Sequence, residues 1–355
     1  MLKIKNISKF VIFIFLSIAI VFLIIYSDIC KIGIERGIML CGNVIIPSLF
    51  PFTVCILIIM KMDFRLENKF LSKVLRCIFG QNFDMFFTML FSFVAGYPIG
   101  CKLINELYLQ NKIDIKTANI MQMYCVNAGP AFIISAVGVG VLHSEKIGII
   151  LFVSHIASSL IIAFFTAKFT KINFKKNTLK IEKNKNFSEI FVNASADAAA
   201  SVMSICVYVI LFSCSNSYLV YFLKDVPIFK NIVYFTEVTS SITFTKNIVF
   251  ISFLLGFSGL SIWCQIFSIS KNAKPNFKLF VLGRMLHGGI SALLTCTFLR
   301  IFNIKQSVFS NAQNYQIKTS YGNIALSISL LIMLIVLSIY IYSKNCSGKL
   351  LDDVI

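Results

Sequence analysis

Long apolar stretches that are broken by proline, glycine and asparagine constrain this sequence more than any other feature. An apolar stretch of about 20 residues is long enough to span a bilayer as a helix. Each backbone amide left unpaired in hydrocarbon costs several kcal/mol, so a broken helix must be buried in protein or line a polar cavity there. Several breaks in one chain therefore indicate a transport site. They are Ile46-Pro47-Ser48-Leu49-Phe50-Pro51, Gly96-Tyr97-Pro98-Ile99-Gly100, Asn127-Ala128-Gly129-Pro130 and Gly256-Phe257-Ser258-Gly259.

Composition places the chain among polytopic membrane proteins of the all-α class. Of 355 residues, 57% are hydrophobic and 14% charged, and the mean hydropathy is +0.84, which excludes a soluble enzyme. The net charge of +18 comes largely from lysines between apolar stretches, the positive-inside pattern, so no nucleic acid partner is expected. The sequence lacks H-E-x-x-H, G-x-S-x-G and Walker motifs, and its eleven cysteines form no C-x-x-C pair. We expect no enzymatic activity, no cofactor and no metal site.

The hydropathy pattern predicts about eight membrane-spanning helices. Two of the eight contain polar groups, and a further segment, 82–110, is predicted to form a re-entrant hairpin or a tight helix pair. The first stretch is interpreted as a retained helix, because no small-x-small cleavage site follows it. The uncharged stretches are 10–26, 37–60, 147–167, 198–223, 247–270 and 323–343, and the two polar ones are 117–142 and 279–299.

Lysine and arginine in the short connections predict the orientation and the division of the chain. The N-terminus and the connections near 61–76, 168–185 and 271–278 fall on one side, so both termini are expected to be cytoplasmic. The halves each carry a broken span and a membrane-embedded histidine, which suggests an inverted repeat, although the spacings differ. The predicted segments are an anchor helix at 1–36, a first half at 37–167, a lysine-rich cytoplasmic linker at 168–186, a second half at 187–300, and a loop with a C-terminal transmembrane helix at 301–355.

The break at 96–100 is the first candidate binding element. Gly96 and Gly100 tolerate positive φ and Pro98 removes a donor, so the chain, including Tyr97, can reverse there and present amides to a ligand. A kinked helix packed tightly on its neighbour explains the same residues. Beyond the break, Lys102 either attracts an anion or extends to the membrane interface.

The break at 127–130 supplies a polar side chain inside an apolar span. The amide of Asn127 can donate and accept, and Gly129 and Pro130 interrupt the helix next to it. Contact with a ligand is one interpretation. The other is that Asn127 caps a broken helix for purely internal reasons.

The second half offers Glu237 and Thr239 in one polar segment, and Ser258, Gly259 and Gln265 in another. A carboxylate inside a membrane is functional by default, whereas at the outer interface Glu237 would be a solvated loop residue. The second segment is interpreted as a hairpin tip or an unwound helix, with Gln265 as a polar ligand. A helix contact between small residues is the alternative.

Other charged and titratable residues are candidates for coupling. Asp197 is the member of a polar stripe nearest the apolar span, and is a candidate for coupling a proton or cation. Arg284 and His287 share a helix face, and His155 lies in the middle of a span. A proton relay and buried histidines with ordinary hydrogen-bond partners both fit this pattern. The stripe consists of Glu189, Asn193, Asp197 and Ser201.

Taken in order, these motifs resemble the YlbJ/SpoVV-type sporulation integral membrane proteins. The resemblance covers 46–52, 96–102, 127–133, the span of His155, 237–239 and 256–260 with Gln265. That family is similar to the Gate, or nucleoside-recognition, domain of concentrative nucleoside transporters and ferrous-iron permeases, which would make both halves Gate-like. The resemblance implies a role in endospore formation in the mother-cell-derived membrane around the forespore, moving dipicolinate. The chain departs at Ser258, where glycine is expected, and at Ser240-Ser241 in place of a Thr-x-Gly pattern.

The combined prediction is a membrane transporter for a small organic anion such as dipicolinate. Hairpin-tip amides, helix N-termini and the side chains of Asn127, Thr239, Ser258 and Gln265 would hold the anion, with Glu237 or Asp197 coupling a proton or cation. The alternatives are a carrier of nucleosides or another small solute, and a non-transporting scaffold for spore assembly. Membrane lipid is the expected surrounding, and a homo-oligomer is left open.

Overall fold

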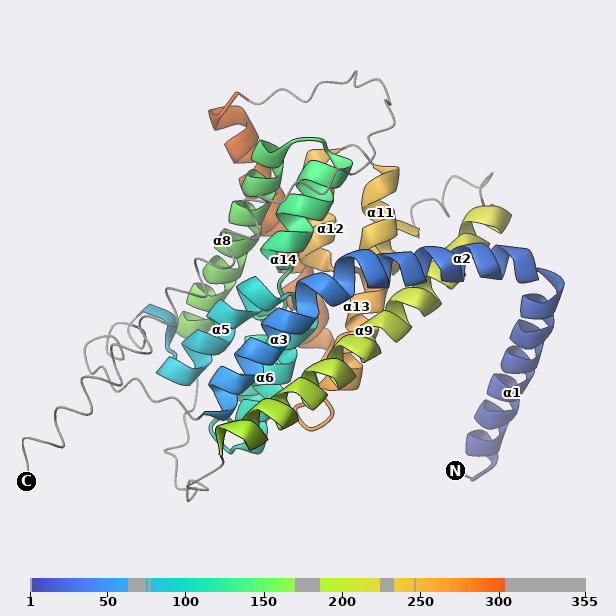
Figure 1. Cartoon of the computed structure of the whole chain (residues 1–355), viewed down its shortest axis with the longest axis horizontal. Coiled ribbons are helices and arrows are strands. Elements are labelled where there is room, and N and C mark those ends of the chain that lie inside the picture. The colour runs from blue at the N-terminus through green and yellow to red at the C-terminus, as the bar shows by residue number, and fades with distance from the viewer. Residues whose placement is uncertain are drawn as a thin grey trace, which may run out of the picture.

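The computed structural model describes residues 2–62, 75, 78–169, 186–223, 233–245 and 247–303. Within these ranges the regular elements are helices joined by short irregular segments, and no strand is present (Figure 1). Side chains are described from residue 12 onward. The helices are α1 (Leu2–Ile25), α2 (Ser27–Leu40), α3 (Ile46–Lys61), α5 (Phe83–Ala95), α6 (Tyr97–Leu109), α7 (Ile115–Tyr124), α8 (Glu145–Phe169), α9 (Phe187–Leu223), α11 (Val238–Phe244), α12 (Ile248–Phe257), α13 (Gly259–Ile269) and α14 (Phe277–Ile301), with π-helical segments η1 (Cys41–Ile45) and η2 (Ala131–Val141).

The all-α membrane fold is confirmed, whereas eight crossings are not. In the described part, four helices are long and apolar enough to cross a membrane, and a fifth is counted if a pair bent by 91° forms one span. The crossing predicted at 323–343 and most of the lysine-rich linker lie outside the described residues. The four are Glu145–Phe169, Phe187–Leu223, Ile248–Ile269 and Phe277–Ile301, and the pair is Ile12–Ile25 with Ser27–Asn43.

The predicted break at 46–51 is wrong. The helical path runs without interruption through α2, η1 and α3, and Figure 1 shows it changing direction between α2 and α3. In η1 the amide of Ile46 bonds the carbonyl of Cys41, five positions back. A π-turn of this kind shifts the hydrogen-bond register just before Pro47, whose missing N–H and bulky ring then cause no break. The helix also begins at Ser27 and not at residue 37.

The other predicted breaks are present in the structure. Gly96 separates α5 from α6 with φ +87°, and residues 125–130 separate α7 from η2. Ser258 and Gly259 separate α12 from α13 with φ +71° and +77°. Positive φ is rare for a residue with a side chain, so Ser258 marks a strained position at this break.

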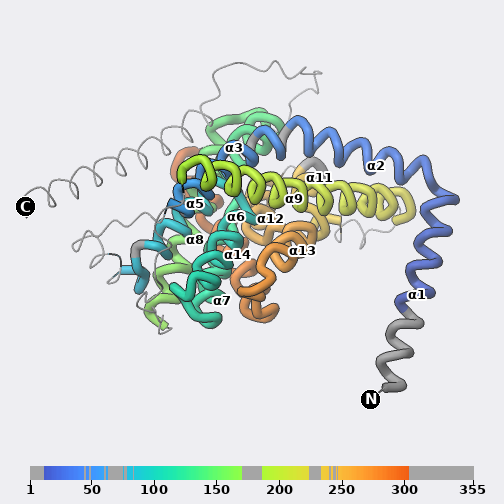
Figure 2. Tube along the Cα trace, turned by 60° about the horizontal axis from the view of Figure 1, so that its bottom comes forward, coloured from blue at the N-terminus to red at the C-terminus, as the bar shows by residue number. Residues whose placement is uncertain are grey.

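Close backbone contacts hold these breaks together around α14. A Cβ on Gly283 would lie 2.8 Å from the Cα of Met123, at the end of α7, and one on Gly256 would lie 2.6 Å from the Cα of Gly288. A Cβ on Gly129 would lie 3.5 Å from the amide nitrogen of Gly96. The breaks that follow α5, α7 and α12 therefore meet in one region, which we call the broken-helix centre. Figure 2 shows α6, α7, α12, α13 and α14 gathered there.

A second region is formed by α2 and the C-terminal part of α9, which we call the α2–α9 pair. The two helices run side by side in both views, and α1 leaves α2 at a sharp angle (Figures 1 and 2). Rings from α1 and α9 meet at this end, with the Phe22 and Phe222 centroids 5.1 Å apart. Apolar side chains such as Phe13, Leu211 and Met203 are exposed on these helices, which suggests contact with lipid.

Candidate functional site

Arg284, at the middle of the broken-helix centre, binds carbonyls that two breaks set free. Its Nη1 lies 2.6 Å from the carbonyl oxygen of Val126 and 3.4 Å from that of Gly256, and its Nη2 donates to the carbonyl of Met123. A helix end leaves such carbonyls without intrahelical partners. The planar guanidinium can reach several acceptors at once, so one side chain from α14 joins the end of α7 to the end of α12.

The charge of Arg284 has no acidic partner among the residues that the structure describes. The side chain is fully buried, and the ion pairs of the described part involve other residues. Besides carbonyls, the guanidinium faces the Nδ1 of His287 at 3.3 Å. A charged side chain inside a membrane bundle is costly and usually lies on an ion or substrate path. Among the described residues, backbone carbonyls, the His287 ring and the face of the Phe280 ring surround this buried positive charge.

Two histidines complete this cluster, and their hydrogen bonds assign their tautomers. The Nε2 of His155 lies 3.0 Å from the backbone nitrogen of Ala128, so Nε2 accepts and the ring proton is on Nδ1. The Nε2 of His287 lies 3.0 Å from the carbonyl oxygen of His155, so this nitrogen donates, and its Nδ1 accepts from Arg284. The ring centroids are 4.3 Å apart. Both rings are neutral in this network, which favours ordinary hydrogen-bonded histidines over a relay.

Asn127 is fully buried and bonded to the end of α7 and to α5. Its Nδ2 donates to the hydroxyl of Ser92 at 2.8 Å and to the carbonyl of Tyr124 at 2.7 Å, and the hydroxyl of Ser159 donates to the same carbonyl at 2.6 Å. These bonds fit the interpretation in which Asn127 caps a broken helix. They also fix the orientation of the amide, with Oδ1 pointing away from these partners.

Three atoms of the cluster have no hydrogen-bond partner in the described part of the chain: Oδ1 of Asn127, Nδ1 of His155 and Nε of Arg284. By the tautomer argument, Nδ1 of His155 carries a proton, and Nε of Arg284 always does. Buried polar atoms are nearly always bonded, so unpaired ones mark places where a ligand or water binds. Nδ1 of His155 and Nε of Arg284 are two hydrogen-bond donors, and Arg284 is a cation, so this part of the cluster suits an anion.

Of the residues predicted at 96–100, one contacts the cluster around Arg284 and the others serve helix packing. The hydroxyl of Tyr97 donates to the carbonyl of Leu255 at 2.7 Å, and its ring meets the His155 ring edge-on. Pro98 lies in the first turn of α6, where a missing N–H is harmless. A Cβ on Gly100 would lie only 1.9 Å from the carbonyl oxygen of Cys125, so this glycine permits close packing. Tyr97 joins the cluster, whereas Gly100 serves helix contact.

At the break at 127–130, helix packing explains the presence of Gly129 and Pro130. A Cβ on Gly129 would lie 2.9 Å from the carbonyl oxygen of Val94. Pro130 starts η2 with helical dihedral angles and binds no side chain at that cap. They let the chain pass close to α5 and then resume a helix.

Glu237 is buried at 2% exposure, so the alternative interpretation, a solvated loop residue, does not hold for it. Its Oε1 accepts from the backbone nitrogen of Thr239 at 2.8 Å, at the start of α11. A Cβ on Gly259 would lie 3.2 Å from the backbone nitrogen of Val238, so the α12–α13 break packs on this segment. Tyr97 is near enough to interact electrostatically with both Glu237 and Arg284, which links Glu237 to the broken-helix centre.

Ser258 and Gln265 bond locally. The hydroxyl of Ser258 and the indole nitrogen of Trp263 both donate to the carbonyl of Phe257, at 2.6 and 2.9 Å. The Nε2 of Gln265 lies 3.4 Å from the hydroxyl of Ser261, one turn away on α13. These contacts stabilise the break and the helix after it.

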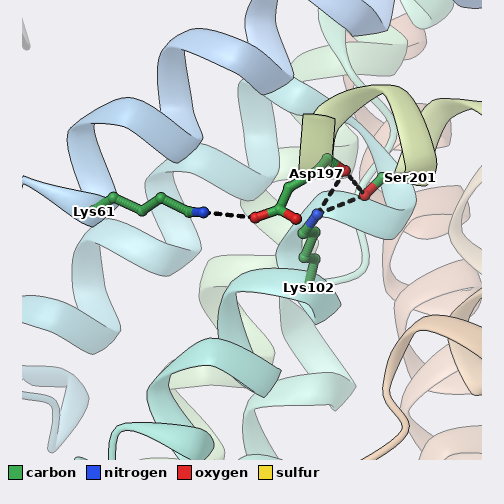
Figure 3. A network of polar contacts seen from close by, with 4 residues as sticks. All are labelled: Lys61, Lys102, Asp197 and Ser201. Atoms are coloured by element: carbon green, nitrogen blue, oxygen red, sulfur yellow. Dashed lines mark hydrogen bonds and ion pairs between the residues drawn. The ribbon is translucent and has the colours of Figure 1, made fainter. Parts of the chain in front are cut away.

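Asp197 belongs to a different polar network, drawn in Figure 3. Its carboxylate pairs with Lys61 at 2.6 Å, and the ammonium of Lys102 donates to the carbonyl of Asp197 at 2.8 Å and to the hydroxyl of Ser201 at 2.6 Å. The network joins α3, α6 and α9. Lys102 therefore binds α9 rather than extending to the interface.

The sequence indicated Arg284, His155 and His287 as titratable candidates, but it did not predict that they belong to the binding site. The signal was a charged residue and a histidine three positions apart on an apolar helix, with glycines on both sides at 283 and 288. Those glycines permit the close contacts that bring the other breaks against this face. A buried arginine flanked by small residues on a spanning helix is thus informative.

Comparison with known proteins finds a similar protein. The chain is 22% identical over 305 residues to the sporulation integral membrane protein YlbJ of Bacillus subtilis (strain 168), covering 73% of this chain and 75% of the relative. No protein-family model matches the sequence, and no solved structure matches it. With the apolar helices, this similarity supports an integral membrane protein.

Proposed function

We propose that this protein is a membrane transporter for a small organic anion in endospore formation, with dipicolinate as the cargo. The observation that carries the proposal is the fully buried Arg284, which lies where three helix breaks meet and has no acidic partner among the described residues. The printed name of the relative supports the sporulation context. The family resemblance supplies the cargo and a location in the outer forespore membrane or the cell membrane. The lysine and arginine pattern of the sequence supports cytoplasmic termini.

A carboxylate suits the unpaired donors of this cluster. Arg284 attracts it by charge and offers Nε, and His155 offers Nδ1. Hydrogen bonds from a charged donor to a carboxylate are about twice as strong as neutral ones. The ring of Tyr97, edge-on to His155, gives a flat aromatic acid an apolar wall. Dipicolinate has two carboxylates on an aromatic ring and so matches both features.

Transport requires this buried cluster to open alternately to each side, because its side chains are fully covered. The breaks at Gly96 and at Ser258 and Gly259 are the places where helices can move relative to one another. Discontinuous helices that meet at a central site are the usual arrangement of secondary transporters. The sequence has no ATP-binding motif, so the movement is either gradient-driven or passive, with Glu237 or Asp197 as the candidate coupling group.

The test measures dipicolinate in mother cell and forespore separately, in strains with the wild-type protein, a deletion, and Asn127→Ala at equal accumulation. We expect dipicolinate to be made but to remain outside the forespore in the deletion strain. Normal loading in the deletion would overturn the cargo. A forespore that loads normally with Asn127→Ala while the deletion fails would remove Asn127 from the site.

The non-transporting scaffold is the second candidate, because the bonds of Arg284 and Asn127 hold the breaks together by themselves. Purified protein in vesicles separates the two functions. A transporter takes up labelled dipicolinate under an imposed gradient, and a scaffold does not. Uptake of labelled nucleosides by the same vesicles tests the alternative that the protein carries nucleosides.

A further inference from the structure

Two cysteines from distant parts of the chain meet in the α2–α9 pair. The sulfur atoms of Cys30 on α2 and Cys214 on α9 lie 3.3 Å apart, although 184 positions separate them in the sequence. Both side chains are partly exposed thiols. A disulfide bond is about 2.05 Å long, so small side-chain rotations would bring these sulfurs to bonding distance.

Small residues explain why the two backbones come so close. Gly33 and Gly37 lie four positions apart on the α2 face that meets α9, which is the small-xxx-small pattern of close membrane helix pairs. A Cβ on Gly33 would lie 2.6 Å from the Cα of Cys214, and one on Gly37 would lie 2.8 Å from the Cα of Ile210. Cys30 is one turn before Gly33, so the glycine contact sets the distance between the thiols.

The surroundings of Cys30 are polar enough for thiol chemistry. Asp28, Lys31, Glu35 and Arg36 are all exposed on α2, and Lys31 pairs with Glu35 at 3.9 Å. Charged side chains at this density place the start of α2 at the membrane surface, in contact with water. Both thiols are partly exposed there, so an oxidant dissolved in water can reach them.

Sequence-based orientation places this site outside the cytoplasm. A cytoplasmic N-terminus puts the end of α1 on the opposite side, and a cytoplasmic lysine-rich linker does the same for the end of α9. The structure brings these two ends together, with the hydroxyl of Tyr218 donating to the carbonyl of Tyr26 at 3.0 Å. Disulfides form and persist in extracytoplasmic compartments.

We propose that Cys30 and Cys214 are a redox site that forms an intramolecular disulfide and fastens α2 to α9. The oxidant is a disulfide of low molecular weight or of a thiol-disulfide oxidoreductase. One thiolate attacks that disulfide and releases a thiol, and the second thiolate then attacks the mixed disulfide. Two protein thiols are oxidised, one external disulfide is reduced to two thiols, and the two protons end on those thiols.

A second cysteine pair on the same helices serves as an internal comparison. Cys41 and Cys206 are both buried, and the thiol of Cys41 donates to the carbonyl of Cys206 at 3.7 Å. The residues that follow them in the sequence, Gly42 and Val207, are uncharged, whereas Lys31 follows Cys30. We expect this pair to stay reduced.

The test uses the full chain in isolated membranes treated with glutathione disulfide. Free thiols are blocked with maleimide, the sample is reduced, and newly exposed thiols are labelled and located by peptide mass spectrometry. We expect the Cys30 and Cys214 peptides to carry the label and to be joined before reduction. Cys30→Ser and Cys214→Ser should each abolish the joined peptide and leave at most a glutathione adduct on the remaining thiol, while Cys264→Ser, at an exposed thiol on α13, should leave the joined peptide unchanged.

Two results would overturn the proposal: no joined Cys30–Cys214 peptide in the oxidised wild type, or a Cys30 cross-link to a second copy of the chain. Gly33→Ala tests the geometry without changing either thiol. Its added methyl group must push the helices apart, so disulfide formation should slow at least several-fold. Gly42→Ala, where a Cβ meets nothing within 4 Å, is the matched control and should keep the wild-type rate. Equal rates for both variants would contradict the proposed approach of the helices.

Discussion

The broken-helix centre and the α2–α9 pair differ in how they use glycine and polar side chains. In the centre, helices end, and Arg284, Asn127 and His155 bind backbone groups that the breaks leave free. In the α2–α9 pair the helices continue, and Gly33 and Gly37 simply permit close contact. Unsatisfied backbone is intolerable in hydrocarbon. Polar side chains therefore accumulate at the breaks, and the uninterrupted pair needs few of them.

The largest expected effect comes from Arg284→Ala. The change removes the buried charge and leaves carbonyls unpaired, each at a cost of about 1 to 3 kcal/mol. Forespore dipicolinate should fall to the deletion level, measured at equal protein accumulation. Arg300→Ala, at the exposed end of the same helix, should load normally. Arg284→Lys should load poorly, because lysine keeps the charge but not the fork of donors. Wild-type loading by Arg284→Ala would exclude this site.

Gly256→Ala tests whether the centre depends on close packing as much as on hydrogen bonds. Its Cβ would lie 2.6 Å from both the Cα and the nitrogen of Gly288, so α12 and α14 must separate. Overpacking of this kind costs about 1 to 3 kcal/mol. We expect a lower thermal midpoint in detergent. Gly289→Ala, whose Cβ meets nothing within 4 Å, should match the wild type. Equal midpoints for the two variants would contradict the tight contact.

Variants of His155 test whether this side chain only accepts a hydrogen bond or also carries a proton. His155→Ala deprives the buried amide of Ala128 of its acceptor and should lower stability by about 1 to 3 kcal/mol. His155→Gln retains an acceptor oxygen and should recover part of that loss, measured by the same thermal unfolding. In vesicles, His155→Gln should still respond to a proton gradient, because the ring is neutral in the network. A stable His155→Gln protein that has lost this response would establish the relay.

The smallest effect is expected at Asp197. The side chain of Asp197 is 47% exposed and that of its partner Lys61 is 31% exposed, and pairs of this kind contribute about 0.2 to 1 kcal/mol. Asp197→Asn should lower the thermal midpoint only slightly. A double-mutant cycle with Lys61→Met would measure the coupling energy of the pair. Loss of transport by a fully stable Asp197→Asn protein would instead support a coupling role and extend the functional region beyond the centre.

Local chemistry made the positions of most breaks predictable. Gly96, residues 127–130 and the pair Ser258 and Gly259 interrupt helices in the structure as expected. The proline motif at 46–51 failed the same reasoning, because a π-turn at Cys41–Ile45 precedes Pro47 in the first turn of α3, and the helix also accommodates Pro51. Whether a proline breaks a helix depends on the hydrogen-bond register of the preceding turn, and that register is not visible in the residue types.

Roles within the candidate site were less predictable. Asn127 and Tyr97 do lie at the centre, whereas Gly100 and Gly129 serve packing and Gln265 bonds within its own helix. Residue type indicates what a side chain can bind. Which partner it meets depends on the neighbouring helix.

The sequence by itself determined that this is an all-α membrane protein and where most of its helix breaks lie, because hydropathy and the chemistry of glycine and proline act locally. Only the tertiary structure decided that Arg284, His155 and His287 form one cluster and that Cys30 meets Cys214. The contacts of Arg284 with Val126 and of Cys30 with Cys214 cross 158 and 184 positions of the chain. Such contacts follow from how closely glycine faces let helices approach, which is a property of pairs of helices and not of either one alone.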